Sequence, residues 1–341
     1  MYQIVKYDAK YKDEVILSLQ YLWGEDFGIN KSKFEWKYER NPQEKRTIAI
    51  VALFDDRVIG FRGFFVSVYA FKGKEIRVLS ASDTIVHPEH RRKGLFSKMT
   101  IKAFELYGND YDVCLNMSSN QYSAPGNIKL GFESIVDRKY LRRVSLKNSI
   151  RNWISSKTGF DFPLEKNIEI SYKCNADKLP QIYFEFINNI NSIYLLKNKE
   201  FFEWRFDNGN KYVFICCKEK AKIIGYLVLL VTINKADILD YAEIPGTRAL
   251  EKLFLYLGKL KFSSLNIMNI SFSSSFLKIL RKSGFKDYGY IERRIWKQYW
   301  NLPILLRPIA VKISKSDWFF YSFYLKDINN WHFTGICSDT T

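Results

Sequence analysis

One stretch of the chain carries most of the information about the fold: Thr84-Ile-Val-His-Pro-Glu-His-Arg-Arg-Lys-Gly-Leu-Phe-Ser-Lys-Met99. Its pattern predicts a strand, then a basic turn with one glycine, then the start of a helix. Such a turn directs several backbone N–H groups toward one point at the positive end of the helix dipole, which suits a pyrophosphate. Arg91, Arg92 and Lys93 add three consecutive cations beside that point. A basic loop before an ordinary helix gives the same pattern, so the surrounding sequence must decide.

Composition indicates a folded protein with more than one domain. The chain has 341 residues, of which 47% are hydrophobic and 17% aromatic, enough to bury a sizeable core. No apolar run reaches the roughly 20 residues that a membrane-spanning helix needs, and the first residues predict a strand and not a signal peptide. The five cysteines show no CxxC spacing, and Cys216 and Cys217 lie in an apolar run. Buried free thiols and a cytoplasmic location are therefore expected.

The net charge of +17 is lysine-rich and spread along the chain. Nucleic-acid binding would fit such a charge, but the sequence contains no helix-turn-helix, zinc finger or RNA-binding motif. Phosphorylated small molecules fit the charge equally well. We therefore expect small-molecule substrates, with no nucleic acid and no membrane among the partners. The oligomeric state is left open.

The chain contains an internal repeat. Phe34-Glu-Trp-Lys-Tyr-Glu returns as Phe202-Glu-Trp-Arg-Phe-Asp, and each copy is followed by an apolar strand and a charged turn. Two further landmarks recur in the same order: Ile59-Gly-Phe61 with Ile224-Gly-Tyr226, and Lys129-Leu-Gly-Phe132 with Lys282-Ser-Gly-Phe285. Three matched landmarks in one order indicate two copies of one fold. The tryptophans of the first landmark, Trp36 and Trp204, are then expected in the core.

Hydrophobic periodicity predicts alternating helices and strands in each copy. The expected helices cover residues 11–22, 96–107 and 123–130 in the first copy and 178–190 in the second. The expected strands of the first copy cover residues 48–54, 58–70, 76–86, 112–117 and 132–145. Residues 146–165 predict a connecting helix and linker, and the aromatic segment 318–333 predicts terminal strands. The order of elements indicates an α/β (α+β) fold, in which mixed, mostly antiparallel sheets are flanked by helices.

These motifs resemble the GNAT superfamily of acyl-CoA-dependent N-acyltransferases. The family pattern is a strand ending Val-x-Pro, then Arg/Gln-x-x-Gly-x-Gly/Ala and a helix, and here it stands as Val86-His-Pro88 and Arg91-Arg-Lys-Gly-Leu-Phe96. The later family landmark, an Asn, a helix and Lys-Leu-Gly-Phe, is matched by Asn120 and Lys129–Phe132. The resemblance implies two tandem GNAT-like domains: residues 1–145 with a CoA site, a linker at 146–177, a degenerate copy at 178–300 and an aromatic extension at 301–341.

The resemblance also implies where CoA lies. Backbone N–H groups near 92–97 would hold its pyrophosphate, and its pantetheine arm would lie where the strand ending at Val86 splays from residues 112–117. The residues implied in CoA binding are Ile85, Val86, Arg91, Arg92, Lys93, Gly94, Leu95, Phe96, Ser97, Asn120 and Ser123. Phe96 departs from the family pattern, which has a small residue at that position. In the second copy the turn at 240–250 is shorter and carries one cation, so we expect CoA in the first copy only.

Acyl transfer needs a base for the amine, a polarised thioester and a proton for the leaving thiolate. Asp83 stands among uncharged neighbours at a strand position where the family often has a base, and a raised pKa would suit that role. The family's usual acid, a tyrosine, is replaced by Asn127, so Tyr122 is the nearest candidate acid, and Asn116 is a candidate to hold the thioester carbonyl. Asn120 and Ser123 fit helix capping as well as CoA binding. His87 and His90 flank a proline, and we expect no metal there.

The general resemblance to tandem-GNAT chains implies a bacterial sugar N-acyltransferase. Such an enzyme would move an acetyl or short acyl group, for example 3-hydroxybutyryl, to a nucleotide-linked amino sugar for surface polysaccharide. Three alternatives stay open: an acetyltransferase of aminoglycosides or protein lysines, a non-catalytic acyl-CoA-binding protein, and a nucleic-acid binder. A carboxylate of Asp83 engaged by neighbouring donors would favour the non-catalytic alternative.

Overall fold

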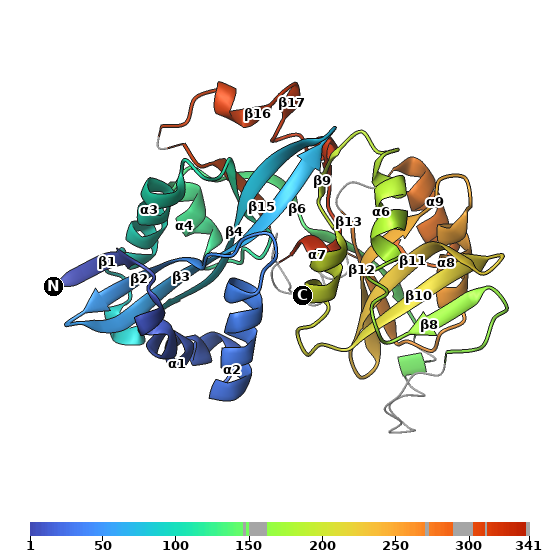
Figure 1. Cartoon of the computed structure of the whole chain (residues 1–341), viewed down its shortest axis with the longest axis horizontal. Helices are drawn as coiled ribbons and strands as arrows, with labels where there is room; N and C mark the ends of the chain where they lie inside the picture. The colour runs from blue at the N-terminus through green and yellow to red at the C-terminus, as the bar shows by residue number, and fades with distance from the viewer. Residues whose placement is uncertain (146–147, 150–161, 270–272, 289–302, 311, 339–341) are drawn as a thin grey trace. The chain divides into compact units, whose positions relative to one another are not determined.

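The computed structural model describes residues 1–145, 148–149, 162–269, 273–288, 303–310 and 312–338 (Figure 1). The chain divides into two compact units. The first comprises Met1–Asp137 and Leu302–Asn330, and the second comprises Arg138–Asn301 and Trp331–Asp339. Each unit is thus built from two separate stretches of sequence.

The first unit contains one mixed sheet with helices on both faces. Its strands are β1 (Tyr2–Lys6), β2 (Ile48–Phe54), β3 (Arg57–Phe71), β4 (Lys74–Val86), β5 (Val113–Asn116), β6 (Glu133–Asp137) and β15 (Pro303–Pro308). Its helices include α1 (Lys12–Trp23), α2 (Phe27–Phe34), α3 (Leu95–Tyr107) and α4 (Ala124–Lys129), with the π-helical turn η2 (Glu35–Glu39) after α2 and the short η3 (Pro88–His90) before α3. Shorter elements complete it: η1 (Ala9–Tyr11), η4 (Ser316–Trp318), β16 (Phe319–Phe320), β17 (Phe323–Tyr324) and η5 (Ile328–Asn330).

The strands of this sheet follow the order β1-β2-β3-β4-β5-β15-β6. All neighbours in that order pair antiparallel except β4 and β5, which pair parallel through Val78–Val113, Leu79–Cys114 and Ser80–Leu115. The buried face of α3, with Leu95 and Met99, packs on one side of the sheet. Val15 and Leu19 of α1 belong to a second core cluster with residues of β2 and β3. Burying both faces explains why β2 and β3 are almost continuously apolar in sequence.

The second unit repeats this plan. Its main sheet has the order β14-β7-β13-β12-β11-β10-β8, and β12 and β13 form its parallel pair. These strands are β7 (Lys139–Val144), β8 (Ile168–Ser171), β10 (Tyr212–Glu219), β11 (Lys222–Val231), β12 (Lys235–Glu243), β13 (Ser264–Asn269) and β14 (Lys286–Asp287). The helices in its described part are α6 (Leu179–Ile187), α7 (Lys199–Arg205), α8 (Ala249–Leu257), α9 (Ser274–Lys282) and the short η6 (Gly335–Cys337). A parallel pair joins β9 (Ile193–Leu195) and β18 (Trp331–His332).

Strand register confirms that the two copies are equivalent. Gly60 pairs with Val86 at the end of β4, and Gly225 pairs with Glu243 at the end of β12. Each of these strands is followed by a turn, a helix and then the short strand that pairs parallel with it. The equivalence makes Asp240 the counterpart of Asp83, because each lies three residues before the strand end.

The predicted strand 132–145 is wrong as a single element. Residues 133–137 form β6 in the first unit, whereas residues 139–144 form β7, which pairs with β13 in the second unit. Conversely, β15 from the expected aromatic extension inserts between β5 and β6. Alternating side chains mark a strand but do not say which neighbour it pairs with, and this is why the sequence did not reveal the exchange.

Other expectations agree with the structure. Trp36 and Trp204 are buried, the cysteines are free, and Cys216 and Cys217 lie buried in β10. Most of the predicted linker, residues 146–147 and 150–161, lies outside the described residues. Within the described part of the chain, we find no helix both long and apolar enough to cross a membrane.

Candidate functional site

The basic turn has the backbone geometry of an anion site. Arg92 and Gly94 both adopt left-handed conformations, with φ of 61° and 73°, so the chain reverses tightly before α3. Gly94 is the N-cap of α3 and has no side chain, and within the described part of the chain no side-chain acceptor bonds to the first N–H groups of this helix. The first helical hydrogen bond runs from Lys98 N to Gly94 O. The N–H groups of Leu95, Phe96 and Ser97 therefore remain available to an acceptor outside the helix.

Positive charge surrounds this helix start. Arg91, Arg92 and Lys93 are exposed, and the guanidinium of Arg91 also donates to Val86 O at 3.2 Å. This bond ties the basic turn to the end of β4. The helix dipole and the three cations act in the same direction, toward binding a phosphorylated ligand.

Strands β4 and β5 separate next to this turn. Their parallel pairing stops at Ser80–Leu115, although β4 continues to Val86. Ile85 and Val86 keep their pairing with β3 and have no partner in β5. The expected splay is thus present.

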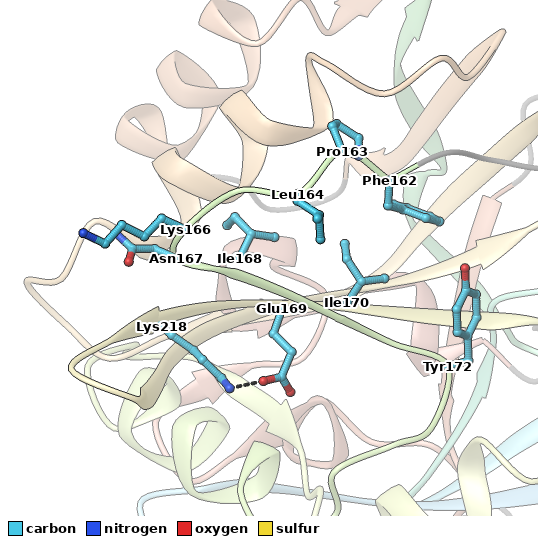
Figure 2. Close-up of a pocket in the computed structure, with 10 residues that line it drawn as sticks. All are labelled: Phe162, Pro163, Leu164, Lys166, Asn167, Ile168, Glu169, Ile170, Tyr172 and Lys218. Carbon is cyan, nitrogen blue, oxygen red and sulfur yellow. Dashed lines mark ion pairs between the residues drawn. The ribbon is translucent and has the colours of Figure 1, made fainter.

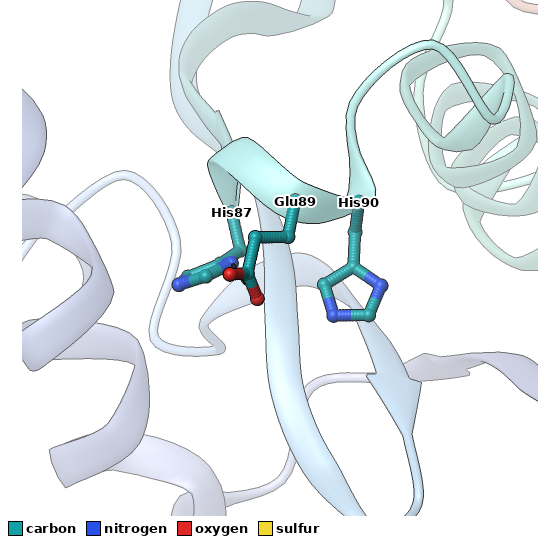
Figure 3. A group of neighbouring side chains, drawn as sticks. All are labelled: His87, Glu89 and His90. Carbon is teal, nitrogen blue, oxygen red and sulfur yellow. Dashed lines mark ion pairs between the residues drawn. The ribbon is translucent and has the colours of Figure 1, made fainter.

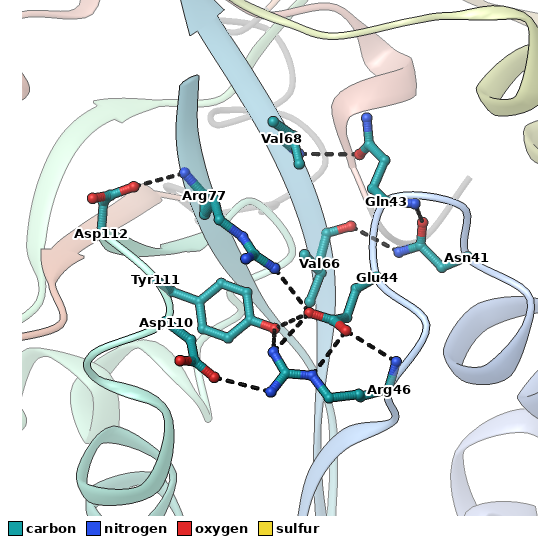
Figure 4. A network of polar contacts seen from close by, with 10 residues as sticks. All are labelled: Asn41, Gln43, Glu44, Arg46, Val66, Val68, Arg77, Asp110, Tyr111 and Asp112. Carbon is teal, nitrogen blue, oxygen red and sulfur yellow. Dashed lines mark hydrogen bonds and ion pairs between the residues drawn. The ribbon is translucent and has the colours of Figure 1, made fainter. Parts of the chain in front are cut away.

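A polar network fixes the closed end of the same strand pair (Figure 4). The carboxylate of Glu44 accepts bonds from Arg46 at 3.0 Å, Arg77 at 2.9 Å and the Tyr111 hydroxyl at 2.5 Å. The Asp112 carboxylate accepts from Arg77 N at 2.7 Å, one residue before the parallel pairing begins. The network therefore joins β4 to the start of β5 at one end, while the other end stays open.

Hydrogen bonding sets the ionisation of Glu44. Burial alone would raise the pKa of this carboxyl, but the bonds from Arg46 and Tyr111 outweigh burial and bring the pKa to about 2. Glu44 is therefore ionised at all but the most acidic pH.

Asp83 is held by donors from three directions. Its carboxylate accepts from Trp23 Nε1 at 3.1 Å, from Lys37 Nζ at 2.8 Å and from the Tyr38 hydroxyl at 2.6 Å. Burial would raise the pKa of Asp83, but the charge of Lys37 and these hydrogen bonds lower it below its ordinary value. The expectation of a raised pKa is therefore wrong, and Asp83 is a poor proton acceptor in this state.

A bulge in β4 positions Asp83. The register shifts from Arg62–Thr84 to Phe64–Ala81, so two residues of β4, Ser82 and Asp83, lie opposite the single residue Gly63 of β3. A side chain on Gly63 would lie 2.4 Å from the Tyr38 hydroxyl, which explains the glycine. No pattern in the sequence indicates that Lys37 and Tyr38, from the Phe-Glu-Trp element, reach Asp83.

Phe96 packs inward from the start of α3. Its ring lies over the guanidinium of the buried Arg62, with the Arg62 Cζ 4.8 Å from the ring centroid. A Cβ on Gly126 of α4 would come within 2.9 Å of the same ring. The large residue at this motif position is therefore accommodated by a glycine on α4 and a buried arginine on β3. Arg62 also donates to Thr84 and, at 3.4 Å, to the Asn127 carboxamide oxygen.

The remaining candidates have mainly local roles in the free protein. The Asn120 carboxamide oxygen accepts from Tyr122 N and Ser123 N, and the Ser123 hydroxyl accepts from Asn120 N, so these two side chains cap the approach to α4. Asn116 is buried at the end of β5, where its oxygen accepts from Ser118 N at 3.0 Å. Tyr122 is 84% exposed, and its role as an acid stays a prediction.

His87, Glu89 and His90 extend from η3 and its flank, beside the basic turn (Figure 3). One possible ligand atom from each lies within 4.8 Å of the others. His90 Nδ1 shares a hydrogen bond of 3.0 Å with the Tyr2 hydroxyl, so this ring already has a protein partner. That no metal acts here stays a prediction.

The equivalent helix start in the second unit is occupied by the protein itself. Arg248, also left-handed at φ 54°, precedes α8, and Leu250 N donates to the Glu243 carboxylate at 2.8 Å. The guanidinium of Arg248 is engaged by Glu251 at 2.9 Å. The Glu243 carboxylate lies where an external anion would bind. This arrangement supports a CoA site in the first unit only.

Comparisons with known proteins agree with this geometry. Residues 9–132 match the family described as the acetyltransferase (GNAT) domain. A comparison with curated proteins found no match. Among solved structures, the fold is similar to a probable N-acyltransferase of unknown function from Enterococcus faecalis V583, with a TM-score of 0.64 and 13% identity over 91% of this chain and 73% of that one.

Two further structures share the fold. One is a GCN5-related N-acetyltransferase from Anabaena variabilis, with a TM-score of 0.61 and 11% identity over 91% of this chain and 74% of that one. The other is the N-myristoyltransferase of Saccharomyces cerevisiae with bound myristoyl-CoA, with a TM-score of 0.55 and 14% identity over 84% of this chain and 80% of that one. At these identities the likeness shows a shared fold.

Residues 9–132 thus match a GNAT acetyltransferase domain, and the whole chain shares the fold of those structures. The matched domain and the anion-binding turn inside it support an acyl-CoA N-acyltransferase. Acyl-CoA is the co-substrate that this class uses.

Proposed function

We propose that this chain transfers an acetyl or short acyl group, such as 3-hydroxybutyryl, from CoA to the amine of a nucleotide-linked amino sugar. The observation that carries the proposal is the uncapped start of α3, flanked by Arg91, Arg92 and Lys93. It offers N–H groups and charge to a pyrophosphate, and it adjoins the splay between β4 and β5. A net charge of +17 suits two phosphorylated substrates. The pathway would be surface-polysaccharide synthesis.

In this proposal CoA binds with its pyrophosphate at Gly94–Ser97 and its pantetheine arm between Ile85–Val86 and the end of β5. The amine attacks the thioester carbonyl, so a C–N bond forms as the C–S bond breaks. The amine loses a proton and the CoA thiolate gains one. Asn116 retains an amide NH₂ group to offer to the thioester carbonyl, because its oxygen is bonded to Ser118 N.

Asp83 serves this reaction as a positioning residue. Its lowered pKa makes it a weak base, and its bonds to Lys37 and Tyr38 fix the bulge in β4. The amine then gives up its proton to water or to a group of the acceptor substrate. Tyr122 is exposed and the Asn127 carboxamide is not an acid, so we assign the thiolate proton to solvent as well.

A thiol-release assay tests the proposal. The protein is incubated with acetyl-CoA or 3-hydroxybutyryl-CoA and a panel of dTDP- and UDP-linked amino sugars, with aminoglycosides and a lysine peptide as competing acceptor classes. We expect free CoA only in the presence of an amino sugar nucleotide, with the N-acyl product seen by mass spectrometry. Turnover on aminoglycosides or the peptide alone would contradict the sugar assignment.

A second candidate, an acyl-CoA-binding protein without turnover, is favoured by one observation, the engaged carboxylate of Asp83. Calorimetric titration of acetyl-CoA separates the two. Tight binding with no thiol release across the whole acceptor panel would favour the second candidate, whereas release with any acceptor removes it.

A further inference from the structure

The second unit contains a cavity of about 420 Å³ at the position equivalent to the expected CoA site of the first. It is lined by Glu243 at the end of β12, by Leu250 near the start of α8, and by residues of α9. In the first unit the matching elements are the end of β4, the start of α3 and α4. The second copy has therefore kept a hollow where the first copy is expected to bind CoA.

The walls of this cavity combine aromatic with uncharged polar side chains, and no described lining residue carries a positive side chain. Tyr241 and Phe276 stack with ring centroids 4.8 Å apart, and Phe186 and Trp331 also line the space. Among the described lining residues none is lysine or arginine, and the one charged group is the Glu243 carboxylate. A phosphorylated ligand such as CoA is disfavoured here, because it would meet this carboxylate and no cation.

One residue that lines this cavity carries a buried polar atom without a partner among the described residues. His332 lines the space and is 8% exposed, and its Nε2 has no hydrogen bond to any described residue. Its ring packs edge-on against Phe186 and Tyr241. Burial, with the nearby Lys197 charge, lowers the pKa of His332 to about 3, so the ring is neutral and Nε2 can accept a hydrogen bond. Buried polar atoms without partners are uncommon in folded proteins, and a ligand that donates to Nε2 would satisfy this one.

A second hollow, along β8, lacks these features (Figure 2). It measures about 580 Å³, and its lining includes Glu169 and Lys218, which form an ion pair with each other. Its apolar side includes the fully exposed Leu164. The mutual neutralisation of Glu169 and Lys218 gives no comparable basis for choosing a ligand.

We propose that the cavity beneath α8 and α9 binds a small organic amine. The ammonium group would lie against the Glu243 carboxylate, with the His332 ring in the same cavity wall, and the apolar body would lie against Tyr241, Phe276 and Trp331. A carboxylate next to aromatic faces is the combination that recognises ammonium groups. This binding site lies wholly within the second unit and does not depend on acyl transfer in the first.

Three probes of similar shape and different charge test the proposal. They are 2-phenylethylamine, 2-phenylethanol and 3-phenylpropionate, titrated into the full chain by calorimetry and by NMR of ¹⁵N-labelled histidine. The chain has only three histidines, so a His332→Gln variant assigns the His332 signal. We expect the amine to bind about tenfold tighter than the alcohol or the acid and to shift the His332 signal.

Matched variants locate the charge. Glu243→Gln keeps an oxygen for Leu250 N and should weaken the amine about tenfold while leaving the alcohol unchanged. Glu251→Gln, on α8 beside Arg248 and outside the cavity lining, should leave both unchanged. Equal or tighter binding of the acid, no response of His332, or equal effects of the two variants would overturn the proposal. The wild-type ranking of probes stands even if a variant fails to fold, and thiol release plays no part in it.

Discussion

The starts of α3 and α8 have equivalent positions in the two copies of the fold but differ in what binds their backbone N–H groups. Each helix follows a long strand and a left-handed residue, Gly94 in the first unit and Arg248 in the second. At α3 the N-cap is a glycine, no side chain of a described residue bonds to the helix start, and three cations lie beside it. At α8 the Glu243 carboxylate accepts from Leu250 N. The difference lies in the source of the anion: the first unit must obtain one from a ligand, whereas the second supplies its own.

A second comparison, between two equivalent aspartates, separates a structural role from a catalytic one. Asp83 and Asp240 occupy equivalent strand positions, and each is bonded to a buried lysine and a tyrosine hydroxyl: Lys37 and Tyr38 for Asp83, Lys197 and Tyr226 for Asp240. Because the copy with a self-capped helix keeps the same arrangement, the aspartate is better explained as part of the frame than as a base.

Substituting either of these two aspartates should destabilise the protein more than any other single change at the two helix starts or the Glu44 network. Asp83→Asn removes the charge that pairs with the buried Lys37, and Asp240→Asn does the same at Lys197. Losing one member of a buried ion pair costs about 3–5 kcal/mol, so both variants should unfold at clearly lower denaturant concentration.

In the folded fraction, Asp83→Asn should lower turnover by less than about tenfold, whereas loss of a general base costs about 100-fold or more. A 100-fold lower turnover at wild-type stability would show that Asp83 acts as the general base.

Acid should weaken the first unit through Glu44. The pKa of this carboxyl is about 2 in the folded protein, below its ordinary value of 4.5, so its contribution to stability is complete above about pH 4.5 and is lost as the pH falls toward 2. The contribution is on the order of 3 kcal/mol. In the second unit the parallel strands are joined by a hydrogen bond that Asn266 Nδ2 donates to the Asp237 carboxylate at 2.7 Å.

Unfolding in urea between pH 5 and pH 2.5 measures this effect, and hydrogen exchange at β4 and β5 localises it. Glu44→Gln should be less stable than wild type at pH 7 and should lose less stability on acidification. Identical pH profiles for the variant and the wild type would show that the Glu44 network does not control acid stability.

Gly94→Asp places a carboxylate at the start of α3, as Glu243 does at the start of α8. Nothing lies within 4 Å of a Cβ at this position, and aspartate tolerates a left-handed conformation better than most residues. A carboxylate at the start of α3 would repel the pyrophosphate and would compete with it for the N–H groups of the helix. Each hydrogen bond from such a group to a charged ligand contributes about 1.5–3 kcal/mol, so CoA affinity should fall about 100-fold. Gly94→Asn has the same shape without the charge and should lose far less. Calorimetry with acetyl-CoA measures both, and equal losses would assign the effect to backbone strain instead.

The sequence was sufficient for the basic turn and its flanking elements because these depend on local patterns. Residues 76–86 and 96–107 were expected as strand and helix, and the structure has β4 and α3 with nearly the same bounds. The sequence could not show that β15 completes the first sheet or that β7 joins the second, because strand patterns do not specify distant partners.

The surroundings of Asp83 were hidden for a related reason. Lys37 and Tyr38 lie more than 40 positions away, and their contact exists only once η2 packs beside the bulge in β4. The repeat was no guide to the partner either, since Asp240 uses Lys197 whereas Arg205, the counterpart of Lys37, donates to Ser338 O. What the fold requires is a buried cation beside this aspartate, and different elements of each copy supply it.

The smallest expected effect comes from the exposed cations of the turn. Replacing Arg91, Arg92 and Lys93 together by glutamine leaves the α3 N–H groups in place and removes only charge at the surface. Exposed pairs contribute about 0.2–1 kcal/mol each, so CoA affinity should fall about tenfold and should become less sensitive to salt. Arg248→Gln, the corresponding loss at α8, should leave CoA binding unchanged because Glu243 already occupies that helix start. If the triple variant bound CoA as tightly as wild type at low salt, the backbone N–H groups alone would account for the difference between the two helix starts.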